Sequence, residues 1–428
     1  MHPHVIESSY PLSFRDEDAK SLGEHLKNRH CVMLIGMKRV GISNFLRFFL
    51  HHKDIANASI ADNKNHLFIP VDLNDLVERE IYPFWVLTLK RIVDAVESSN
   101  HEASLKKKIA SLFLDSIQSQ DLFFTIDCVR KSIHLLVSQD IVPTIFFLRF
   151  DRISSVVSHQ FVANLEGLRD SVHQRLSYVI TSFRPLDYLS PSIDKAWQSV
   201  LFHVQYIQPG KKEDIETIFN AYQKKYALTL SGDVQEELFR LVDGYTQYLQ
   251  FALIILHEQK KGVTTKQELF DLLCKDERIA LQSEELWESL EKEEQQVLLK
   301  IHAGKKLTDE NLAAGKYLFH TGMVTDNKIF SPLYSYYLAQ KEEAKIDGKA
   351  VEFTKKENLL LSFLQSANGE ICEREAIIEA VWPEALSLGV SDWAVDRLVA
   401  RVRNKLKLQK SASEIQTVKT RGYKLVSL

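Results

Sequence analysis

The 428-residue chain has little of what builds disulfide frameworks, flexible linkers and membrane spans. Its four cysteines lie far apart, with no CxxC pair and no Cys/His cluster at metal-ligand spacing, so we expect neither disulfides nor a metal site. Ten prolines and 15 glycines are too few for long low-complexity stretches. The longest apolar runs, such as 142–150, are much shorter than the ~20 residues of a membrane-spanning helix. Residues 1–18 lack the apolar core of a signal peptide, so we expect a cytoplasmic protein with no membrane partner.

The first half of the chain alternates apolar runs with stretches of helical periodicity. The runs show no apolar/polar alternation, which is typical of strands that are covered on both faces of a parallel sheet. Strands separated by helices predict a doubly wound α/β domain over residues 19–207. After residue 208 the strand pattern stops and helical patterns predominate. The five predicted strands are 30–35, 66–71, 143–150, 176–181 and 200–207.

The last 80 or so residues have a different pattern. Helices are predicted at 355–366, 374–381 and 392–408, and a strand pair follows at 414–419 and 423–426, which is the layout of a winged helix. In the third helix, one apolar stripe at helical spacing lies opposite a basic face. The stripe consists of Val395, Leu398, Val399, Val402 and Leu406, and the basic residues are Arg397, Arg401 and, at the flank, Arg403.

The charge of the chain is unevenly distributed. Residues 392–428 contain nine Lys and Arg against three acids, a net charge of +6, so the remaining residues carry −9 to give the total of −3. A basic module at the end of an acidic chain indicates attraction to phosphate groups.

Several short motifs in this module occur together and in a fixed order. They are Phe353-Thr-Lys-Lys-Glu357, Ala380-Val-Trp382, Val395-Asp396, Arg401-Val-Arg-Asn-Lys-Leu406 and Thr417-Val-Lys-Thr-Arg-Gly-Tyr-Lys-Leu425. With these motifs the segment resembles the OmpR/PhoB-type winged helix of bacterial transcription regulators. It departs from that pattern at Thr420 and Arg421, where the family usually has a glycine and a small apolar residue.

The resemblance implies that the module binds double-stranded DNA. Its recognition helix would contact DNA through Arg397, Arg401 and Arg403, and its wing through Thr417, Lys419 and Arg421. The alternative is that the basic helix face docks on another protein. Trp382, Trp393 and Tyr423 are expected in the core rather than stacked on bases.

Near the N-terminus, a strand is followed by a glycine-containing turn and a helix. Gly36, Gly41 and Ser43 resemble the P-loop pattern G-x-x-x-x-G-K-[ST], but Ile42 stands where the pattern has its lysine. Lys38, within the loop, is the candidate substitute. The candidate nucleotide-binding residues are Gly36, Lys38, Gly41, Ser43 and Asp151.

The third predicted strand leads into Leu148-Arg-Phe-Asp-Arg152, where P-loop ATPases of the AAA+ and STAND type have acidic residues. If Phe150-Asp151-Arg152 aligns with the end of that motif, Leu148 and Arg149 occupy both acid positions. In the other register Asp151 is the metal-site acid, but Arg152 follows it. Neither register restores a complete hydrolytic site, so we expect no catalytic residues and no efficient ATPase activity.

Further motifs resemble those of the STAND and AAA+ families. They are Tyr178–Pro185, Gly244–Gln250 with Thr246 in place of a proline, 294–298 and 318–322. The implied fold is an α/β P-loop NTPase-like parallel sheet, a helical lid, a small winged helix and a C-terminal winged helix-turn-helix. The expected segments are 1–18 (N-terminal segment), 19–207 (P-loop NTPase-like), 208–282 (lid), 283–345 (small winged helix) and 346–428 (DNA-binding).

The leading hypothesis is a DNA-binding transcriptional regulator whose degenerate sensor core controls the C-terminal winged helix. A signal ligand or protein would act on the core, and homo-oligomers would bind repeated half-sites. ATP or ADP with Mg²⁺ could still bind through the backbone loop without efficient hydrolysis. The alternatives are an active ATP-dependent AAA+ protein of the origin-binding or loader type, and a protein-interaction scaffold.

Overall fold

The computed structural model describes residues 5–189, 200, 202–226, 228–259, 262–346, 353–382, 392–409, 411–418 and 421–427. They form two compact units, each assembled from two stretches of chain. The first unit contains Met1–Thr264 and Glu291–Ser331, and the second contains Thr265–Leu290 and Pro332–Leu428. The small helical subdomain of the first unit is thus inserted between two segments of the second.

A five-stranded sheet of order β2-β3-β4-β1-β5 forms the centre of the first unit. All neighbouring strands are parallel, which confirms the predicted sheet. Every residue of β1 and β4 is buried, as expected for strands covered on both faces, whereas the edge strand β2 is buried only at alternate positions. The strands are β1 (Cys31–Ile35), β2 (Asn65–Asp72), β3 (Ile141–Leu148), β4 (Ser177–Ser182) and β5 (Phe202–Tyr206).

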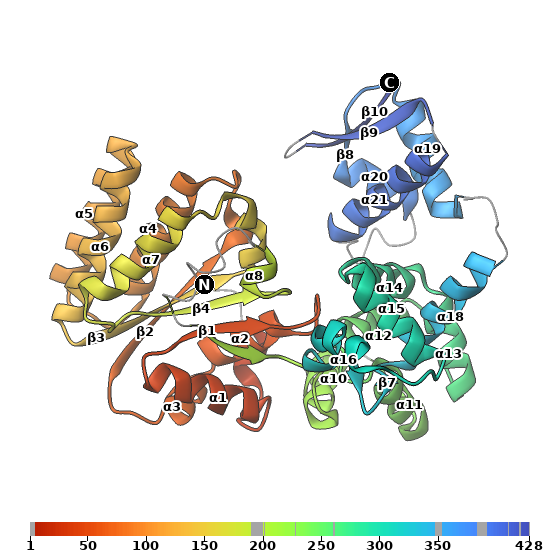
Figure 1. Cartoon of the computed structure of the whole chain (residues 1–428), viewed down its shortest axis with the longest axis horizontal. Helices are drawn as coiled ribbons and strands as arrows, with labels where there is room; N and C mark the ends of the chain where they lie inside the picture. The colour runs from red at the N-terminus through yellow and green to blue at the C-terminus, as the bar shows by residue number, and fades with distance from the viewer. Residues whose placement is uncertain are drawn as a thin grey trace. The chain divides into compact units, whose positions relative to one another are not determined.

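Helices cover both faces of this sheet (Figure 1). On one face lie α1 (Asp16–Lys27), α2 (Ile42–His51) and α3 (Ile55–Ile60). On the other lie α4 (Ile81–Ser98), α5 (Ala103–Ser119), α6 (Leu122–Ser138) and α7 (His159–Ser171). Short 3-10 turns, η1 (Ile6–Ser9), η2 (Leu73–Asp75) and η3 (Phe150–Val156), and the one-turn helix α8 (Leu186–Leu189) complete the described connections.

The rest of the first unit is mainly helical. After β5 come α10 (Lys212–Tyr226), α11 (Gly232–Val242) and α12 (Thr246–Glu258), in the region where a lid was expected. A small subdomain combines α15 (Lys292–His302), α16 (Asp309–Ala314), α17 (Lys316–His320) and a hairpin of β6 (Val324–Thr325) and β7 (Lys328–Ile329).

The second unit begins with α13 (Lys266–Lys275) and α14 (Glu277–Glu288), which pack with α18 (Pro332–Ile346). The boundary expected between residues 282 and 283 therefore lies inside α14. No helix in the described part of the chain is long and apolar enough to cross a membrane.

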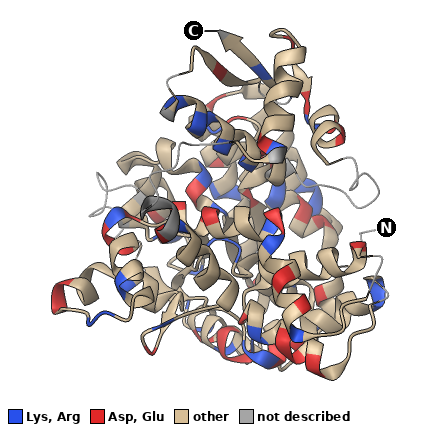
Figure 2. Ribbon diagram, turned by 90° about the vertical axis from the view of Figure 1, so that its right-hand side faces the viewer, with Lys and Arg blue, Asp and Glu red and all other residues tan. Residues whose placement is uncertain are grey.

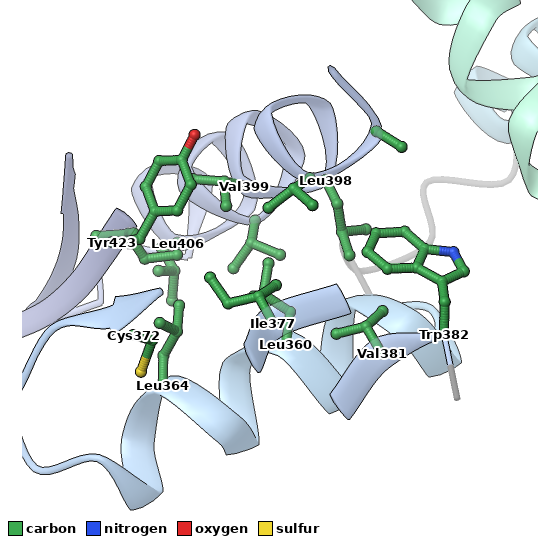
Figure 3. Close-up of a cluster of buried hydrophobic side chains, with 14 residues drawn as sticks. Leu360, Leu364, Cys372, Ile377, Val381, Trp382, Leu398, Val399, Leu406 and Tyr423 are labelled. Atoms are coloured by element: carbon green, nitrogen blue, oxygen red, sulfur yellow. The ribbon is translucent and has the colours of Figure 1, made fainter. Parts of the chain in front are cut away.

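The described residues of the C-terminal module form three helices and a three-stranded sheet of order β8-β10-β9. The helices are α19 (Lys355–Ser366), α20 (Arg374–Val381) and α21 (Asp392–Leu408), and the strands are β8 (Cys372–Glu373), β9 (Ser413–Val418) and β10 (Gly422–Ser427). Figure 3 shows their apolar side chains converging on one core, in which Trp382 and Tyr423 are buried as expected. The side chain of Trp393 lies outside the described residues.

Candidate functional site

Helix α21 is positioned by the apolar stripe that the sequence predicted. Val395, Leu398, Val399 and Val402 are completely buried, and the side chains that Figure 3 labels on α21 point towards α19 and α20. Burying this stripe fixes the rotation of the helix and turns the face with Arg397 and Arg401 away from the core of the module. Figure 2 marks the basic residues of the chain in blue and the acidic ones in red.

The two arginines of this face lie against acidic residues of α14, within the same unit. Arg397 Nη1 is 2.8 Å from Glu288 Oε2, and Arg401 Nε is 3.1 Å from Glu284 Oε2. The side chains of Arg397 and Arg401 are only 13% and 17% exposed. In this structure the face of α21 that carries Arg397 and Arg401 is therefore covered by α14 of the same unit.

These ion pairs are close in distance but poorly aligned as hydrogen bonds. Arg397 Nε and Nη2 and Arg401 Nε are buried and have no hydrogen-bond partner. Burial also raises the pKa of Glu277, which lies 3.7 Å from Lys356 and 3.9 Å from Arg401. These guanidinium donors of Arg397 and Arg401 at the interface between α14 and α21 are therefore buried without hydrogen-bond partners. Such unsatisfied donors lower the stability of the interface.

Glu357 is a buried acid that connects α19 to α21. Its carboxylate is fully buried, accepts a hydrogen bond from the backbone N–H of Thr354 in a capping box, and lies 2.5 Å from Lys405 Nζ. Arg401 Nε is 3.0 Å from the same carboxylate. Arg401 therefore neutralises a buried charge of its own module as well as contacting α14, a role that the sequence pattern did not reveal.

The wing residues, and Arg403 of α21 beside them, have different surroundings. Arg403 donates to Ile415 O at 2.7 Å and to Thr417 Oγ1 at 2.8 Å, so it fixes strand β9 on α21. Arg421 is exposed in the turn between β9 and β10. Lys419 lies outside the described residues. Gly422 is required at this turn because its φ is 152° and a Cβ there would lie 2.0 Å from Cys372 O.

The glycine loop between β1 and α2 contains Gly36, Gly41 and Ser43 of the P-loop-like pattern. Gly36 is buried at the end of β1, Gly41 has φ 121°, and Ser43 is half-buried in the first turn of α2. Groups from the start of α12 bind this loop. Tyr245 Oη donates to Lys38 O at 2.6 Å and Thr246 Oγ1 donates to Val40 O at 3.0 Å.

Three charged residues that the sequence analysis considered with this loop have different surroundings. Lys38 Nζ lies 4.6 Å from the centre of the Phe183 ring. Arg149, directly after β3, forms an ion pair with Asp72 and donates its backbone N–H to Thr181 Oγ1 at 2.8 Å. Asp151 is half-buried in η3, and burial raises the pKa of its carboxyl group.

A buried ion pair joins the end of strand β4 to the small helical subdomain. Arg184 donates to both carboxylate oxygens of Glu294, at 2.7 and 2.6 Å, and stacks on Tyr317 with 3.8 Å to the ring centre. Tyr317 Oη also donates to Phe183 O at 2.8 Å. Glu294 lies 110 residues after Arg184, so no local pattern in the sequence indicates this contact.

Comparison with known proteins gives one match in sequence. Residues 348–425 match the family model described as "Transcriptional regulatory protein, C terminal". No curated protein matches the chain.

Several solved structures are similar to the chain at low sequence identity. One is the ORC2 protein of Aeropyrum pernix in its ADPNP–ADP complexes, 14% identical over 80% of this chain and 89% of that chain, with a TM-score of 0.45. Another is a Walker-type ATPase of Pyrococcus abyssi, 17% identical over 76% and 95%, TM-score 0.45. A third is domain III of the Thermotoga maritima replication initiation protein DnaA, 14% identical over 64% and 97%, TM-score 0.37.

The α/β core is defined by its own strand order, β2-β3-β4-β1-β5. The C-terminal module is supported by both sequence and structure, because the family match covers the three helices and the wing. Residues 348–425 are thus similar to the OmpR/PhoB-type winged-helix DNA-binding domain of transcriptional regulatory proteins.

Proposed function

We propose that this protein is a DNA-binding transcriptional regulator in which α14 covers the recognition helix until a signal releases it. The observation that carries the proposal is the pairing of Arg397 and Arg401 with Glu288 and Glu284. The same arginines are the ones that the winged-helix resemblance assigns to DNA. Double-stranded DNA is the partner, and pairs of chains on repeated half-sites would enlarge the modest interface of one module.

The acids of α14 and a DNA backbone compete for the same cations. Phosphates and carboxylates both accept hydrogen bonds from guanidinium groups, and an arginine that is four-fifths or more buried against α14 cannot reach a DNA groove. The misaligned, buried guanidinium donors lower the stability of the covered state. A change elsewhere in the chain needs to supply only a modest free energy to expose them.

The connection of α14 to the core suggests where that change originates. Only residues Ser289–Glu291 separate the end of α14 from the start of α15. Helix α15 carries Glu294, which Arg184 holds to the end of β4. A ligand or protein that shifts β4 or the glycine loop would move α15 through this ion pair, and the short connection would transmit the movement to α14.

We further propose that the core senses its signal without efficient ATP hydrolysis. Ile42 stands in place of the phosphate-binding lysine, and Arg149 occupies the end of β3 next to Asp72. The backbone N–H groups of the glycine loop remain suited to phosphate. Nucleotide binding would then act as a switch rather than as the start of a reaction cycle.

The experiment is a DNA-binding titration of the full chain over a range of salt concentrations, with a mixed-sequence duplex of about 40 bp that spans several helical turns. The test variant Glu284→Gln/Glu288→Gln removes two charges from α14. The control Glu293→Gln/Glu310→Gln removes two charges from exposed positions outside the interface. We expect at least about tenfold tighter binding for the α14 variant, with a steeper salt dependence, and less than about a twofold change for the control.

The outcomes separate the two parts of the proposal. If neither wild type nor variant shows salt-dependent DNA binding, the DNA-binding function is wrong. If both bind equally and tightly, the function stands and the covering role of α14 is wrong.

A second candidate function is supported by the same ion pairs. The basic face of α21 already docks on an acidic protein helix, which is what a protein-interaction scaffold would do. This candidate predicts no DNA binding after α14 is neutralised, and binding of an acidic helical partner instead.

A further inference from the structure

Three histidines gather at one edge of the central sheet in the first unit. His25 is near the end of α1, His30 directly precedes β1, and His203 lies in β5, where it pairs with Val32 of β1. Their ring centres are 4.1–5.6 Å apart. The cluster lies where β1 and β5 begin, whereas the glycine loop follows the end of β1, so it is distinct from the candidate nucleotide site.

The spacing of the ring nitrogens matches the coordination sphere of a small metal ion. His25 Nδ1 and His30 Nδ1 are 3.3 Å apart. Two nitrogens bound to one tetrahedral zinc ion, each at about 2.0–2.1 Å, are roughly 3.3–3.4 Å apart. Each of the three histidines offers one ring nitrogen as a ligand, and these three nitrogens all lie within 4.8 Å of one another. His203 is exposed, so its ring can rotate to complete the set.

The electrostatic surroundings keep the imidazoles in the form that binds metals. Burial and the neighbouring histidines lower the pKa of His25 and of His30, so both are neutral at pH 7. The charged groups that act on them are Glu24 on His25 and Arg169 on His30. In a neutral imidazole the proton can reside on Nε2, which leaves the Nδ1 lone pairs of both His25 and His30 free to bind one metal ion.

We propose that His25, His30 and His203 form a binding site for a first-row transition metal, with zinc as the foremost candidate. Three imidazoles leave a fourth position for water or an external ligand. Imidazole sets of this kind also bind Co²⁺, Ni²⁺ and Cu²⁺. The bound ion would connect α1 and the start of β1 to the edge strand β5, and would thereby stabilise the sheet.

The proposal differs from the sequence-based expectation that the chain has no metal site. His25 and His30 are five residues apart and no CxxC pair accompanies them, and His203 is 173 residues further along the chain. Only the parallel pairing of β1 with β5 brings them together.

The test is a titration of metal-free full-length protein with Co²⁺, followed by competition with Zn²⁺. We expect one equivalent to bind with the intense visible absorption of a tetrahedral cobalt site, and zinc to abolish that absorption. His25→Ala and His203→Asn should each weaken binding at least about tenfold, whereas His159→Ala, an exposed histidine on α7, should leave it unchanged. Zinc should also raise the melting temperature of the wild type but not of His25→Ala.

Proton competition supplies a second measurement. Because protons and metal ions compete for the same imidazole nitrogens, the site should release its metal as the pH falls. Failure of the wild type to bind one equivalent, or equal cobalt affinity in His25→Ala, His203→Asn and His159→Ala, would overturn the proposal. Far-ultraviolet circular dichroism confirms that each variant is folded.

Discussion

The glycine loop of the first unit and the recognition helix of the second differ in what covers them. The loop receives neutral hydrogen bonds from Tyr245 and Thr246 to backbone carbonyl groups. The recognition helix is held by carboxylates of α14 that pair with its arginines. Neutral hydrogen bonds are almost insensitive to salt, whereas partly exposed ion pairs weaken as ionic strength rises. The two covers should therefore respond to different conditions.

The glycine loop and helix α21 also differ in which of the expected basic side chains are present. The C-terminal module has arginines at the positions that its resemblance assigns to DNA, and in the proposed function α14 covers them. The loop lacks the lysine itself, because Ile42 occupies its position. Removing a cover should therefore expose the arginines of the second unit, whereas in the first unit a new side chain would be needed to supply the missing phosphate contact.

The largest expected effect comes from breaking the ion pair between Arg184 and Glu294. Their side chains are only 3% and 5% exposed, so Arg184→Met leaves a buried carboxylate without its partner. We expect the free energy of unfolding of the first unit to fall by about 3–5 kcal/mol, measured by urea denaturation. Glu293→Gln, at a neighbouring exposed position, should change it by less than about 0.5 kcal/mol.

The double variant Arg184→Met/Glu294→Gln sharpens this test. It removes both charges, while glutamine still allows the capping box of α15. It should recover part of the lost stability. If the single variant is as stable as the wild type, the ion pair cannot transmit movement from β4 to α15.

A smaller effect is expected from supplying the missing lysine. Ile42→Lys should tighten binding of ATP with Mg²⁺ at least about tenfold, because a lysine at this position reaches the β- and γ-phosphates. A fluorescent nucleotide titration measures the change, and Ile42→Met is the uncharged control. Turnover should stay at background in both variants because Arg149 still occupies the end of β3. Turnover by the wild type would favour the active ATPase alternative.

Helices and strands were predicted well from the sequence where apolar residues recur at a regular spacing or form a continuous run. The helices 355–366, 374–381 and 392–408 agree with α19, α20 and α21, because each combines an apolar stripe with defined ends such as the capping box of Thr354 and Glu357. The predicted strands of the sheet lie within about two residues of β1–β5. Continuous apolar runs were sufficient to identify them.

Contacts between distant segments could not be predicted in this way. In the sequence, the acidic residues of α14 look like those of any solvent-exposed helix, and only the structure shows that they contact α21. Arg184 and Glu294 are 110 residues apart, so no local pattern predicts their ion pair. The arginines assigned to DNA were identified from a resemblance, which specifies their type and position but not what else in this chain binds them. Their acidic partners belong to a helix that no family motif describes.

The smallest expected effect concerns Arg421, the exposed arginine of the wing. No acid of α14 covers it, so its contribution to DNA binding should be the same in the wild type and in Glu284→Gln/Glu288→Gln. Arg421→Ala should weaken binding about three- to tenfold and reduce the slope of log K against log salt by about one, as expected for the loss of one phosphate contact. Lys224→Ala, an exposed cation on α10, is the control and should change neither quantity.

If Arg421→Ala weakens binding only when α14 is neutralised, α14 covers the wing as well as the recognition helix. If it has no effect in either background, the wing does not contact the DNA backbone, and α21 alone carries the interface.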